Sequence, residues 1–413
     1  MKQYPKYKDS GVSWIGEIPE RWNTRRLKFS CNLIQEKTTD SSLPYIALEN
    51  IESYSGKLLS TNTSIPEGSC NLYSTNDVLF SKLRPYLTKC VVAPSEGKCS
   101  SELLVLRDFE GENKYLQYLM LSPKYIEYID SSTYGAKMPR ANWLFIGNTS
   151  IPLPPLSEQH AIVSYLDKKT AQIDRFISEA TKEIEKLNEL KQTQIAHLVT
   201  HGTNPDAPMK ESGIAWIGQI PEHWEVNKIR SHFKERRTKV SDKDYPALSV
   251  AREGIVPQLD TAVKTDNGDN RKLVLKNDFV VNSRSDRKGS CGVSDYDGSV
   301  SLISIVLEPH DINPQYVHYL FRSNNYVEEF YRNGRGIVAD LWTTRYSEMR
   351  NIFIPIPPVS EQKDIVSAIN SLNNKIDTLV SELTTQINHL KELKQRVISD
   401  AVTGKIDVRE VNN

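Results

Sequence analysis

Residues 151–174 read IPLPPLSEQHAIVSYLDKKTAQID, and residues 354–377 read IPIPPVSEQKDIVSAINSLNNKID. The two stretches match at an offset of 203 residues, and each joins a proline-rich strip to the start of an amphipathic segment. Proline disfavours helical backbone in the residue before it, so both strips are expected to be extended. Ser157 and Ser360 are then expected to be helix N-caps, followed by Glu158 and Glu361 in the first turn. The same junction between an extended strip and a helix therefore occurs twice in the chain.

Two further pairs of stretches repeat in nearly the same register. Residues 8–22 (KDSGVSWIGEIPERW) and 210–224 (KESGIAWIGQIPEHW) are identical at ten of fifteen positions, and LNELKQ at 187–192 matches LKELKQ at 390–395. The chain is therefore predicted to be two copies of a unit of about 200 residues, related by pseudo-two-fold symmetry. The stretches 23–150 and 225–353 correspond only in outline. One scaffold is thus expected to present two different binding surfaces.

A heptad stripe follows each proline-rich strip. Its members in the first copy are Ile173, Ile177, Ala180, Ile184, Leu187, Lys191, Gln194 and Leu198. Its members in the second copy are Ile376, Val380, Leu383, Ile387, Leu390, Lys394, Val397 and Ala401. A sustained heptad favours a coiled-coil seam between the two helices, although any long amphipathic helix shows such a stripe on its buried face. Each helix would have about 44 residues and a length of about 66 Å.

The rest of each copy alternates short β-branched or aromatic runs with turn-rich spacers, and helices are predicted near 113–130 and 314–331. The predicted fold is therefore α+β, with two globular domains joined by two long antiparallel helices in a nearly circular, pseudo-two-fold arrangement. In that arrangement the C-terminus lies beside the N-terminal Trp14 segment. The predicted divisions are a first domain (1–156), a first helix (157–203), a second domain (204–359), a second helix (360–405) and a tail (406–413). Trp14, Trp22, Trp216 and Trp224 are expected to pack each domain onto the helix ends.

The composition narrows the function classes. The 413 residues hold 52 Lys and Arg against 52 Asp and Glu, which excludes a uniformly basic nucleic-acid coat and an acidic tail. No apolar run approaches the roughly 20 residues that span a bilayer, and the first residues lack the apolar core of a signal peptide. Five unevenly spaced cysteines without a C-x-x-C pair favour a reducing compartment over a disulfide framework or a zinc site. A cytoplasmic protein without a membrane partner is expected.

Motifs for catalysis are absent from the sequence. There is no Walker A loop, no glycine-rich dinucleotide loop, no H-E-x-x-H and no G-x-S-x-G. Asn313-Pro-Gln-Tyr316 resembles the Asn-Pro-Pro-Tyr of amino-methyltransferases. The second proline is missing and no cofactor loop accompanies it, so a helix N-cap followed by proline is the favoured interpretation.

Basic residues interleaved with polar and aromatic ones remain as candidate site residues. They occur in the stretches 81–86 (SKLRPY), 135–143 (GAKMPRANW), 228–239 (KIRSHFKERRTK), 282–290 (NSRSDRKGS), 332–336 (RNGRG) and 342–345 (WTTR). In such loops lysine can bind phosphate, while arginine and asparagine can read base edges in the major groove. Any single lysine or arginine is more often solvated surface, but the clusters together indicate DNA.

These features resemble the specificity subunit of Type I restriction–modification systems. The resemblance rests on the tandem SG-x-x-WIG-x-IP-x-x-W, the doubled IP-x-PP-x-SEQ, and the strings LFSKLRPYLTK, AKMPRANW and VVNSRSDRKGSCG, and it covers essentially the whole chain. It implies two target-recognition domains, each reading one half of a split, asymmetric sequence in double-stranded DNA. The helices would be a ruler and the docking site for two methyltransferase subunits, which restriction (motor) subunits then join.

The resemblance also implies where chemistry and recognition reside. This chain would have no active site and bind no cofactor itself, with S-adenosylmethionine, ATP and Mg²⁺ on the partner subunits. The DNA-reading role is carried onto Lys82, Arg84, Lys137, Arg140, Asn142, Arg284, Arg287, Lys288, Arg335 and Arg345. Two alternatives stay open: a stand-alone DNA methyltransferase or nuclease with degenerate motifs, and a scaffold that binds protein.

Overall fold

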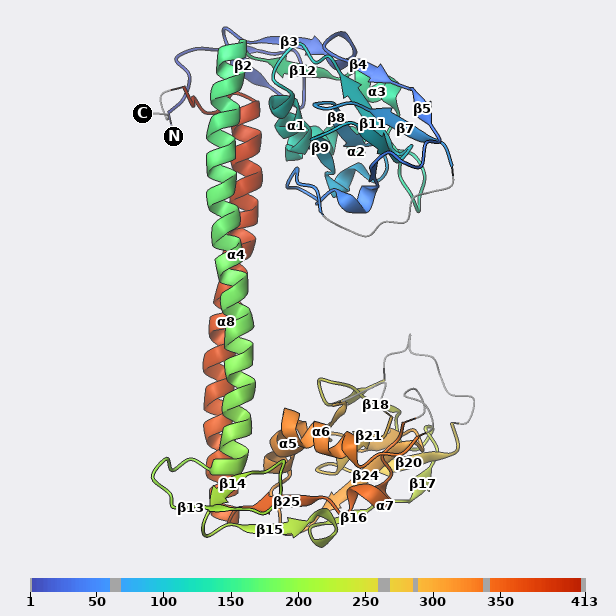
Figure 1. Cartoon of the computed structure of the whole chain (residues 1–413), viewed down its shortest axis with the longest axis vertical. Coiled ribbons are helices and arrows are strands. Elements are labelled where there is room, and N and C mark those ends of the chain that lie inside the picture. Colours follow the sequence, from blue (N-terminus) through green and yellow to red (C-terminus); the bar gives the residue numbers. More distant parts are fainter. Residues whose placement is uncertain (1, 60–67, 259–267, 285–288, 337–341, 410–413) are drawn as a thin grey trace. The chain divides into compact units, whose positions relative to one another are not determined.

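A computed structural model describes residues 2–59, 68–258, 268–284, 289–336 and 342–409 of the chain. The chain divides into two compact units, unit 1 (Met1–Thr181 with Thr384–Asn413) and unit 2 (Lys182–Leu383) (Figure 1). Both points where the chain passes from one unit to the other lie inside long helices, α4 (Leu156–His201) and α8 (Val359–Val402). Each unit mixes helices with strands, as the predicted α+β class with two domains requires.

Unit 1 is built around small, mostly antiparallel sheets and three short α-helices. Its strands are β1 (Tyr7–Asp9), β2 (Glu17–Pro19), β3 (Asn23–Arg26), β4 (Asn32–Ile34), β5 (Lys37–Thr38), β6 (Tyr45–Ile46), β7 (Cys70–Tyr73), β8 (Val78–Ser81), β9 (Cys90–Val92), β10 (Gly97–Cys99), β11 (Leu103–Arg107) and β12 (Ser150–Leu153). Its helices before α4 are α1 (Asn113–Leu121), α2 (Pro123–Asp130) and α3 (Trp143–Asn148). The two larger sheets have the orders β4-β11-β8-β9 and β5-β7-β10-β6.

Unit 2 repeats this plan. Its strands are β13 (Met209–Glu211), β14 (Gln219–Pro221), β15 (Glu225–Lys228), β16 (Phe233–Glu235), β17 (Lys239–Val240), β18 (Leu248–Val250), β19 (Ile255–Pro257), β20 (Arg271–Val274), β21 (Phe279–Asn282), β22 (Cys291–Val293), β23 (Gly298–Val300), β24 (Ser304–Pro309) and β25 (Phe353–Ile356). Its helices before α8 are α5 (Pro314–Arg322), α6 (Asn324–Arg332) and α7 (Tyr346–Met349). The sheet β16-β24-β21-β22 corresponds to β4-β11-β8-β9 of unit 1.

The junction between each proline-rich strip and its helix differs from the prediction. The strips form strands β12 and β25, as expected, but the helices begin at Leu156 and Val359, one residue before each serine. Ser157 and Ser360 are therefore not N-caps. The glutamate after each serine binds a tryptophan instead. Trp22 Nε1 donates to Glu158 Oε2 at 2.7 Å, and Trp224 Nε1 donates to Glu361 Oε2 at 2.8 Å. These bonds fix each tryptophan segment on the first turn of a helix.

In both units a buried tyrosine joins the proline-rich strand to the last turn of a long helix. Tyr115 Oη donates to the carbonyl oxygens of Pro152 and Val402 at 3.0 and 3.2 Å. In the second copy Tyr316 Oη donates to Pro355 and Val199 at 3.1 and 3.0 Å. In unit 1 the backbone N–H of Asp407 also donates to Lys2 O at 2.9 Å, so the segment after α8 lies beside the N-terminal segment. Each domain is thus completed by the last turn of the helix that arrives from the other copy.

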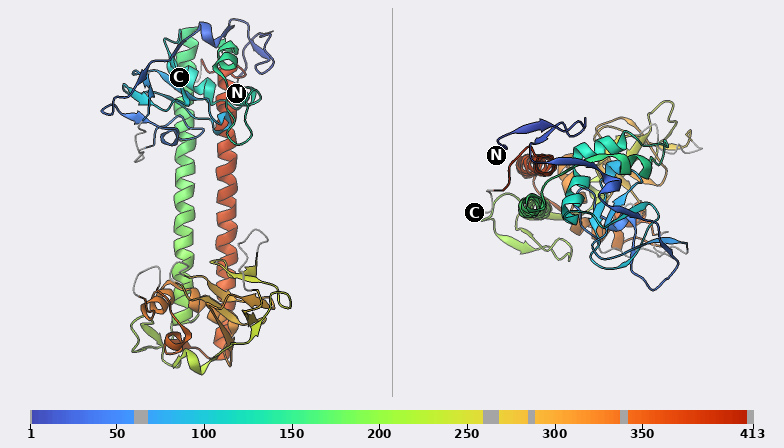
Figure 2. Two further views of the ribbon diagram at one scale, coloured as in Figure 1. Left: turned by 90° about the vertical axis from the view of Figure 1, so that its right-hand side faces the viewer. Right: turned by 90° about the horizontal axis from the view of Figure 1, so that it is seen from above.

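The two long helices lie side by side and antiparallel in each unit (Figure 2). Two ion pairs set their register: Asp174 Oδ1 with Lys394 Nζ at 2.6 Å in unit 1, and Asp377 Oδ1 with Lys191 Nζ at 2.7 Å in unit 2. The pairs are equivalent, because both aspartates and both lysines are related by the offset of 203 residues.

The predicted stripe coincides with the covered face of both helices over most of its length. Ile173, Ile376 and Ile387 are buried, whereas Ile177, Ile184, Leu187, Val380, Leu383 and Leu390 are half-buried. The stripe was wrong at Gln194, which is exposed while Ile195 is buried in its place, whereas Leu198, Val397 and Ala401 are covered as predicted. A helix with 3.6 residues per turn drifts away from a strict heptad, which moves the buried face by one residue near the end.

Other sequence-based expectations about packing hold in the described part of the chain. Trp22 and Trp224 are fully buried, and Trp14 and Trp216 are nearly so. Asn313 caps α5, since its side-chain oxygen accepts from the N–H groups of Gln315 and Tyr316. The helical stretches 113–130 and 314–331 are each divided into two helices at a serine, Ser122 or Ser323. Within the described residues, no helix is long and apolar enough to cross a membrane.

Candidate nucleic-acid interface

Two basic segments of unit 1 that are distant in sequence meet at the end of strand β8. The backbone N–H of Ala141 donates to Lys82 O at 2.9 Å, and that of Arg84 donates to Pro139 O at 2.7 Å. Leu83 also forms a β-bridge with Arg140. The structure therefore brings together the predicted residues Lys82, Arg84, Lys137, Arg140 and Asn142 on one pair of cross-linked segments.

Unit 2 has the same bridge at the end of β21. Arg284 and Arg335 each form a β-bridge with Thr343, and the N–H of Thr344 donates to Ser283 O at 3.1 Å. Thr343 corresponds to Arg140 at the offset of 203 residues. The predicted residues Arg284, Arg335 and Arg345 are thus brought together, whereas Arg287 and Lys288 lie outside the described residues. One backbone framework presents two different sets of side chains.

The five predicted side chains of unit 1 are not equivalent. Arg140 forms an ion pair with Glu102, with Nε and Oε2 at 3.2 Å, and this hydrogen bond raises the pKa of the guanidinium. Asn142 Oδ1 accepts from the N–H of Leu144 and caps α3. Lys82 and Lys137 have no ion pair with any described residue. The two lysines are therefore the side chains in this set most available to a phosphate or a base.

Arg84 has an unusual backbone and an unsatisfied donor. Its φ is +48°, in the left-handed region that few residues other than glycine adopt. One terminal nitrogen donates to Lys137 O at 3.2 Å, but the buried Nε has no hydrogen-bond partner within the described chain. Such a combination of backbone strain and an orphan donor is typical of a functional position.

The cations of unit 2 are more exposed. Arg284 and Arg345 are exposed, and Arg335 has only a long contact of 3.8 Å between its Nε and Glu348 Oε1. Tyr331 Oη donates to Arg284 O at 3.1 Å, and the N–H of Arg284 donates to Asn282 Oδ1 at 3.0 Å. These two bonds hold the backbone of Arg284 in place, while its exposed guanidinium has no ion pair with any described residue.

The most basic stretch of the sequence, 228–239, is partly engaged in contacts within unit 2. Arg236 Nε pairs with Asp278 at 2.7 Å inside unit 2, and Arg237 Nε pairs with Glu235 at 2.6 Å. The ammonium group of Lys228 lies 5.0 Å from the centre of the Phe353 ring. Arg230, Lys234, Arg237 and Lys239 are nevertheless exposed, so contact of this stretch with nucleic acid stays a prediction.

Sequence reasoning missed a hollow beside the basic segment of each unit. The hollow of unit 1 has a volume of about 290 Å³ and is lined by Leu33, Ile34, Gln35, Lys37, Asn71, Lys82, Ser101, Leu103 and Leu104. The hollow of unit 2 has a volume of about 240 Å³ and is lined by Leu248, Ser249, Val250, Gln258, Arg271, Asn282, Arg284, Val300, Ser301, Ile303 and Ser304. The lining residues come from strands that are far apart in sequence, so no local pattern could have grouped them.

The described residues hold no cluster of metal ligands, and their cysteines are buried. The five cysteines are buried and unpaired, and burial raises the pKa of Cys31, Cys99 and Cys291 to about 12. These thiols therefore remain protonated and poorly nucleophilic at neutral pH. No group of three or more His, Cys, Asp or Glu side chains is arranged to hold a metal ion among the described residues.

Comparison with known proteins matches both copies to one family. The model of the Type I restriction modification DNA specificity domain matches residues 12–186 and 221–389. The chain is 28% identical to the Type I restriction enzyme MjaVIII specificity subunit of Methanocaldococcus jannaschii, over 77% of this chain and 76% of the relative. It is 26% identical to the putative type I restriction enzyme MjaX specificity subunit of the same organism, over 99% of each.

The fold has a counterpart among solved structures. A chain solved in a study of complex assembly and conformational transition of the type I R-M system superimposes with a TM-score of 0.70 at 18% sequence identity. The superposition covers 94% of this chain and 99% of the solved one. The two family matches fall one in each copy of the duplication, and together they span most of the chain. The chain therefore belongs to the Type I restriction modification DNA specificity domain family.

Proposed function

We propose that this chain is the sequence-specific DNA-recognition subunit of a Type I restriction–modification complex, and that each copy reads one half of a split, asymmetric sequence in double-stranded DNA. One observation carries the proposal: the bridge that presents the basic segments is the same in both units, while the presented residues differ. Lys82 O and Ser283 O accept equivalent backbone bonds, yet Arg140 of the first copy is replaced by Thr343 in the second. A common framework with different side chains suits two readers of unlike half-sites.

The helices α4 and α8 serve as a spacer in this proposal, paired as an antiparallel coiled coil. Both crossings between the units lie inside these helices, and the Asp174–Lys394 and Asp377–Lys191 ion pairs favour a single register. A stiff spacer allows both readers to engage only half-sites at one separation, so helix length would set the gap between the half-sites. The bases in each half-site would depend on the domains.

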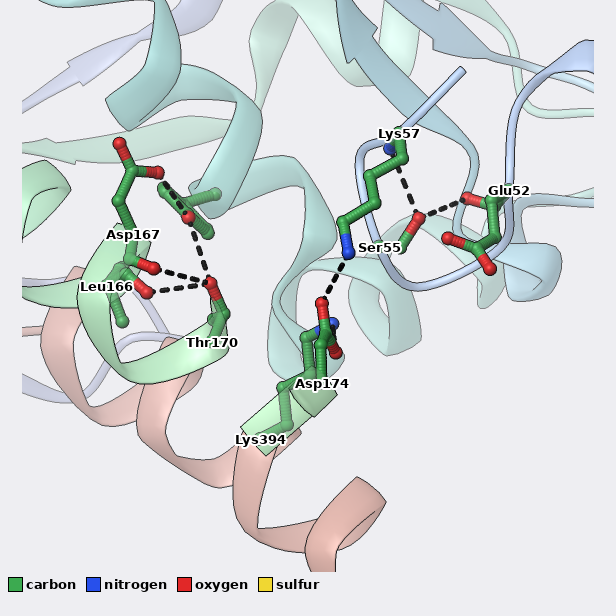
Figure 3. Close-up of polar contacts among 9 residues, drawn as sticks. Glu52, Ser55, Lys57, Leu166, Asp167, Thr170, Asp174 and Lys394 are labelled. Atoms are coloured by element: carbon green, nitrogen blue, oxygen red, sulfur yellow. Dashed lines mark hydrogen bonds and ion pairs between the residues drawn. The ribbon is translucent and has the colours of Figure 1, made fainter. Parts of the chain in front are cut away.

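One flank of the helix pair contacts the globular domains. In unit 1 Tyr118 Oη donates to Asp167 Oδ1 at 2.7 Å. Lys57 Nζ donates to Asp174 Oδ2 at 2.6 Å (Figure 3). In unit 2 Tyr319 Oη donates to Asn370 Oδ1 at 2.6 Å. Ile173 and Ile376 are d positions of the heptad, and Ile177 and Val380 are a positions. Asp167, Asp174 and Asn370 therefore occupy e positions, which border one side of the seam. This e flank holds the domains.

The opposite flank carries exposed apolar residues in matched pairs. Phe176 and Leu393 are 59% and 44% exposed in unit 1, and Leu379 and Leu190 are 46% and 48% exposed in unit 2. All four are g positions, which border the same side of the seam in an antiparallel pair. Phe176 and Leu393 lie within two residues of the Asp174–Lys394 ion pair, and Leu379 and Leu190 within two residues of Asp377–Lys191. Each unit therefore has one apolar patch made from both helices.

We propose that these two equivalent patches dock two identical methyltransferase subunits. A pair of equivalent surfaces binds two copies of one partner, even though the DNA readers differ. The restriction (motor) subunits would then join this core. Catalysis, S-adenosylmethionine, ATP and Mg²⁺ are assigned to those partners, and this chain is proposed to contribute recognition and assembly without an active site.

A binding selection with the assembled complex tests the proposal. The chain is combined with its methyltransferase subunits, and DNA is selected from a random duplex library at physiological salt. A bipartite, asymmetric consensus with a fixed gap is expected. Selected DNA without a consensus would favour the protein-binding scaffold. Methylation or cleavage by the pure chain alone, supplied with S-adenosylmethionine, ATP and Mg²⁺, would favour the stand-alone enzyme.

A further inference from the structure

The hollow of unit 1 combines a positioned lysine with a positioned amide. The N–H of Lys82 donates to Glu102 O at 3.0 Å and its carbonyl accepts from Ala141 at 2.9 Å, so the backbone is held on both sides. Asn71 Nδ2 donates to Leu103 O at 2.9 Å, which sets the plane of the carboxamide. Its Oδ1 and its second N–H have no hydrogen-bond partner among the described residues, so they are open to a ligand. These two side chains line the same hollow, Asn71 from strand β7 and Lys82 from the segment that follows β8.

The hollow of unit 2 has the buried side chain of Arg271 at one side and the exposed side chain of Arg284 at its rim. Arg271 is nearly fully buried, and it donates to Ser299 Oγ at 2.8 Å and Ser299 O at 3.0 Å, both neutral acceptors. Arg284 is exposed, and Asn282 Oδ1 fixes its backbone N–H. Gln258 lines the hollow with its backbone N–H bound to Ala247 O at 3.0 Å. This hollow too presents guanidinium and carboxamide groups.

The size of the hollows limits what they can take. Pockets for drug-sized ligands and cofactors measure roughly 300–1,000 Å³, so volumes of about 290 and 240 Å³ are at or below the lower limit. Gln35 and Lys37 at the first hollow are exposed, which leaves it open to a large ligand that inserts only one edge. The edge of a base pair in a DNA groove meets these conditions, since it projects donors and acceptors from a larger body.

The chemistry of the lining matches base edges. Lysine and arginine bind the O6 and N7 acceptors of guanine, and asparagine and glutamine bind the N6 and N7 groups of adenine. We propose that each hollow admits base edges of one half-site, read by Asn71 and Lys82 in unit 1 and by Gln258 and Arg284 in unit 2. This inference rests on the proposed function and adds Asn71 and Gln258 as specificity-determining residues. Arg271 is a positioning residue that holds the wall of the second hollow through Ser299.

A base reader and a phosphate binder respond differently to mutation. Loss of a phosphate contact weakens binding to all sequences alike, whereas loss of a base contact relaxes the preference at one position. We therefore test Asn71→Ala and Gln258→Ala in the complex with methyltransferase subunits, and measure methylation of duplexes that differ from the preferred site by one base. Gln172→Ala on α4 and Gln315→Ala on α5 are matched controls, because both are exposed amides outside the hollows.

The expected outcome is specific to one half-site. Asn71→Ala raises the relative methylation of sites mismatched at one base of the first half by about tenfold, and leaves the second half unchanged. Gln258→Ala does the converse, and the controls keep the wild-type preference. A uniform loss at every sequence, or no change, overturns the inference. If the wild-type complex has no bipartite preference at all, it is the proposed function that has failed.

A second pair of variants keeps the test valid if an alanine variant folds poorly. Asn71→Asp and Gln258→Glu retain the shape of the side chain but replace an amide donor by an acceptor. Carboxylates accept from the N4 amino group of cytosine, so each variant is expected to gain preference for cytosine at the position where the wild-type residue prefers adenine. A gained preference cannot arise from misfolding. Retention of the adenine preference by both folded variants would contradict the assignment.

Discussion

A matched insertion in the two long helices should lengthen the gap between the half-sites without changing their bases. The design duplicates residues 182–188 after Asn188 in α4 and duplicates residues 380–386 before Val380 in α8. The two insertion points face each other in the register set by the ion pairs. Asp174 and Lys394 therefore stay together on one side of the insertion, and Lys191 and Asp377 on the other.

The size of the effect follows from helix geometry. Seven residues at a rise of about 1.5 Å add about 10.5 Å to each helix. With one base pair for each 3.4 Å or so of duplex, the preferred gap should grow by about three base pairs. A heptad keeps the a and d positions in phase, so the seam from Ile173 to Leu187 is continued by the added residues rather than displaced.

Methylation mapping measures both properties at once. A host that expresses the variant with its methyltransferase subunits is expected to methylate the original half-sites across the longer gap. Duplication in α4 alone is the control, because it displaces the two helices against each other and should abolish stable assembly. An unchanged gap, or new bases in either half-site, would refute the spacer role.

Three further predictions concern single contacts. Phe176→Asp or Leu379→Asp should each reduce the stoichiometry from two methyltransferase subunits to one, as measured by native mass spectrometry, and two bound subunits in both variants would contradict the docking patches. Asp174→Asn should destabilise unit 1 by about 1–3 kcal/mol, because it leaves the nearly buried ammonium group of Lys394 without its carboxylate, whereas Asp377→Asn should cost below about 1 kcal/mol. The side chain of Asp174 is 24% exposed, whereas that of Asp377 is 62% exposed. Hydrogen exchange measures the loss of stability in each unit, and equal losses in the two variants would refute the predicted difference. Arg284→Ala should weaken DNA binding by the complex and relax the base preference at one position of the second half-site, and unchanged binding with an unchanged preference would assign Arg284 to the solvated surface.

The Asp174 contact also predicts a dependence on pH. Burial alone would raise the pKa of this carboxyl group, but hydrogen bonds from Lys394 and Lys57 lower it below the ordinary value. A carboxylate with a lowered folded pKa stabilises the fold above its unfolded pKa of about 3.9, and this contribution is lost as the pH falls through the lower folded value. Wild-type unit 1 should therefore be more stable than the Asp174→Asn variant at neutral pH and lose this extra stability only in acid. An advantage that is the same at pH 7 and pH 2 would contradict the ion pair.

The sequence predicted the scaffold well because the scaffold is duplicated and periodic. The junctions near Pro152 and Pro355 and the stripe from Ile173 to Leu187 depend on local patterns that survive folding. The N-caps were misplaced by one residue because Ser157 and Ser360 are typical caps, whereas the helices begin at Leu156 and Val359, and the tertiary contact of Trp22 with Glu158 in the first turn was not visible in the local pattern. The preference of serine for an N-cap position is weak compared with the free energy of tertiary contacts.

The candidate site was predictable only in part. Basic segments around Lys82 and Arg284 were found because their composition is unusual, but composition did not reveal that Arg140 pairs with Glu102 or that Asn142 caps α3. Asn71 and Gln258 were missed, since each is an ordinary polar residue until strands from other parts of the chain enclose it. Pairing between distant strands is the step that no local pattern encodes.

The central claim is that the two copies read two different half-sites independently. Methylome sequencing tests it most directly, in a host that expresses the wild-type chain, a chain with residues 23–150 replaced by those of another family member, or a chain with residues 225–353 replaced. We predict that each replacement changes one half of the methylated sequence and preserves the other half and the gap. A replacement that alters both halves together, or neither, would contradict the account.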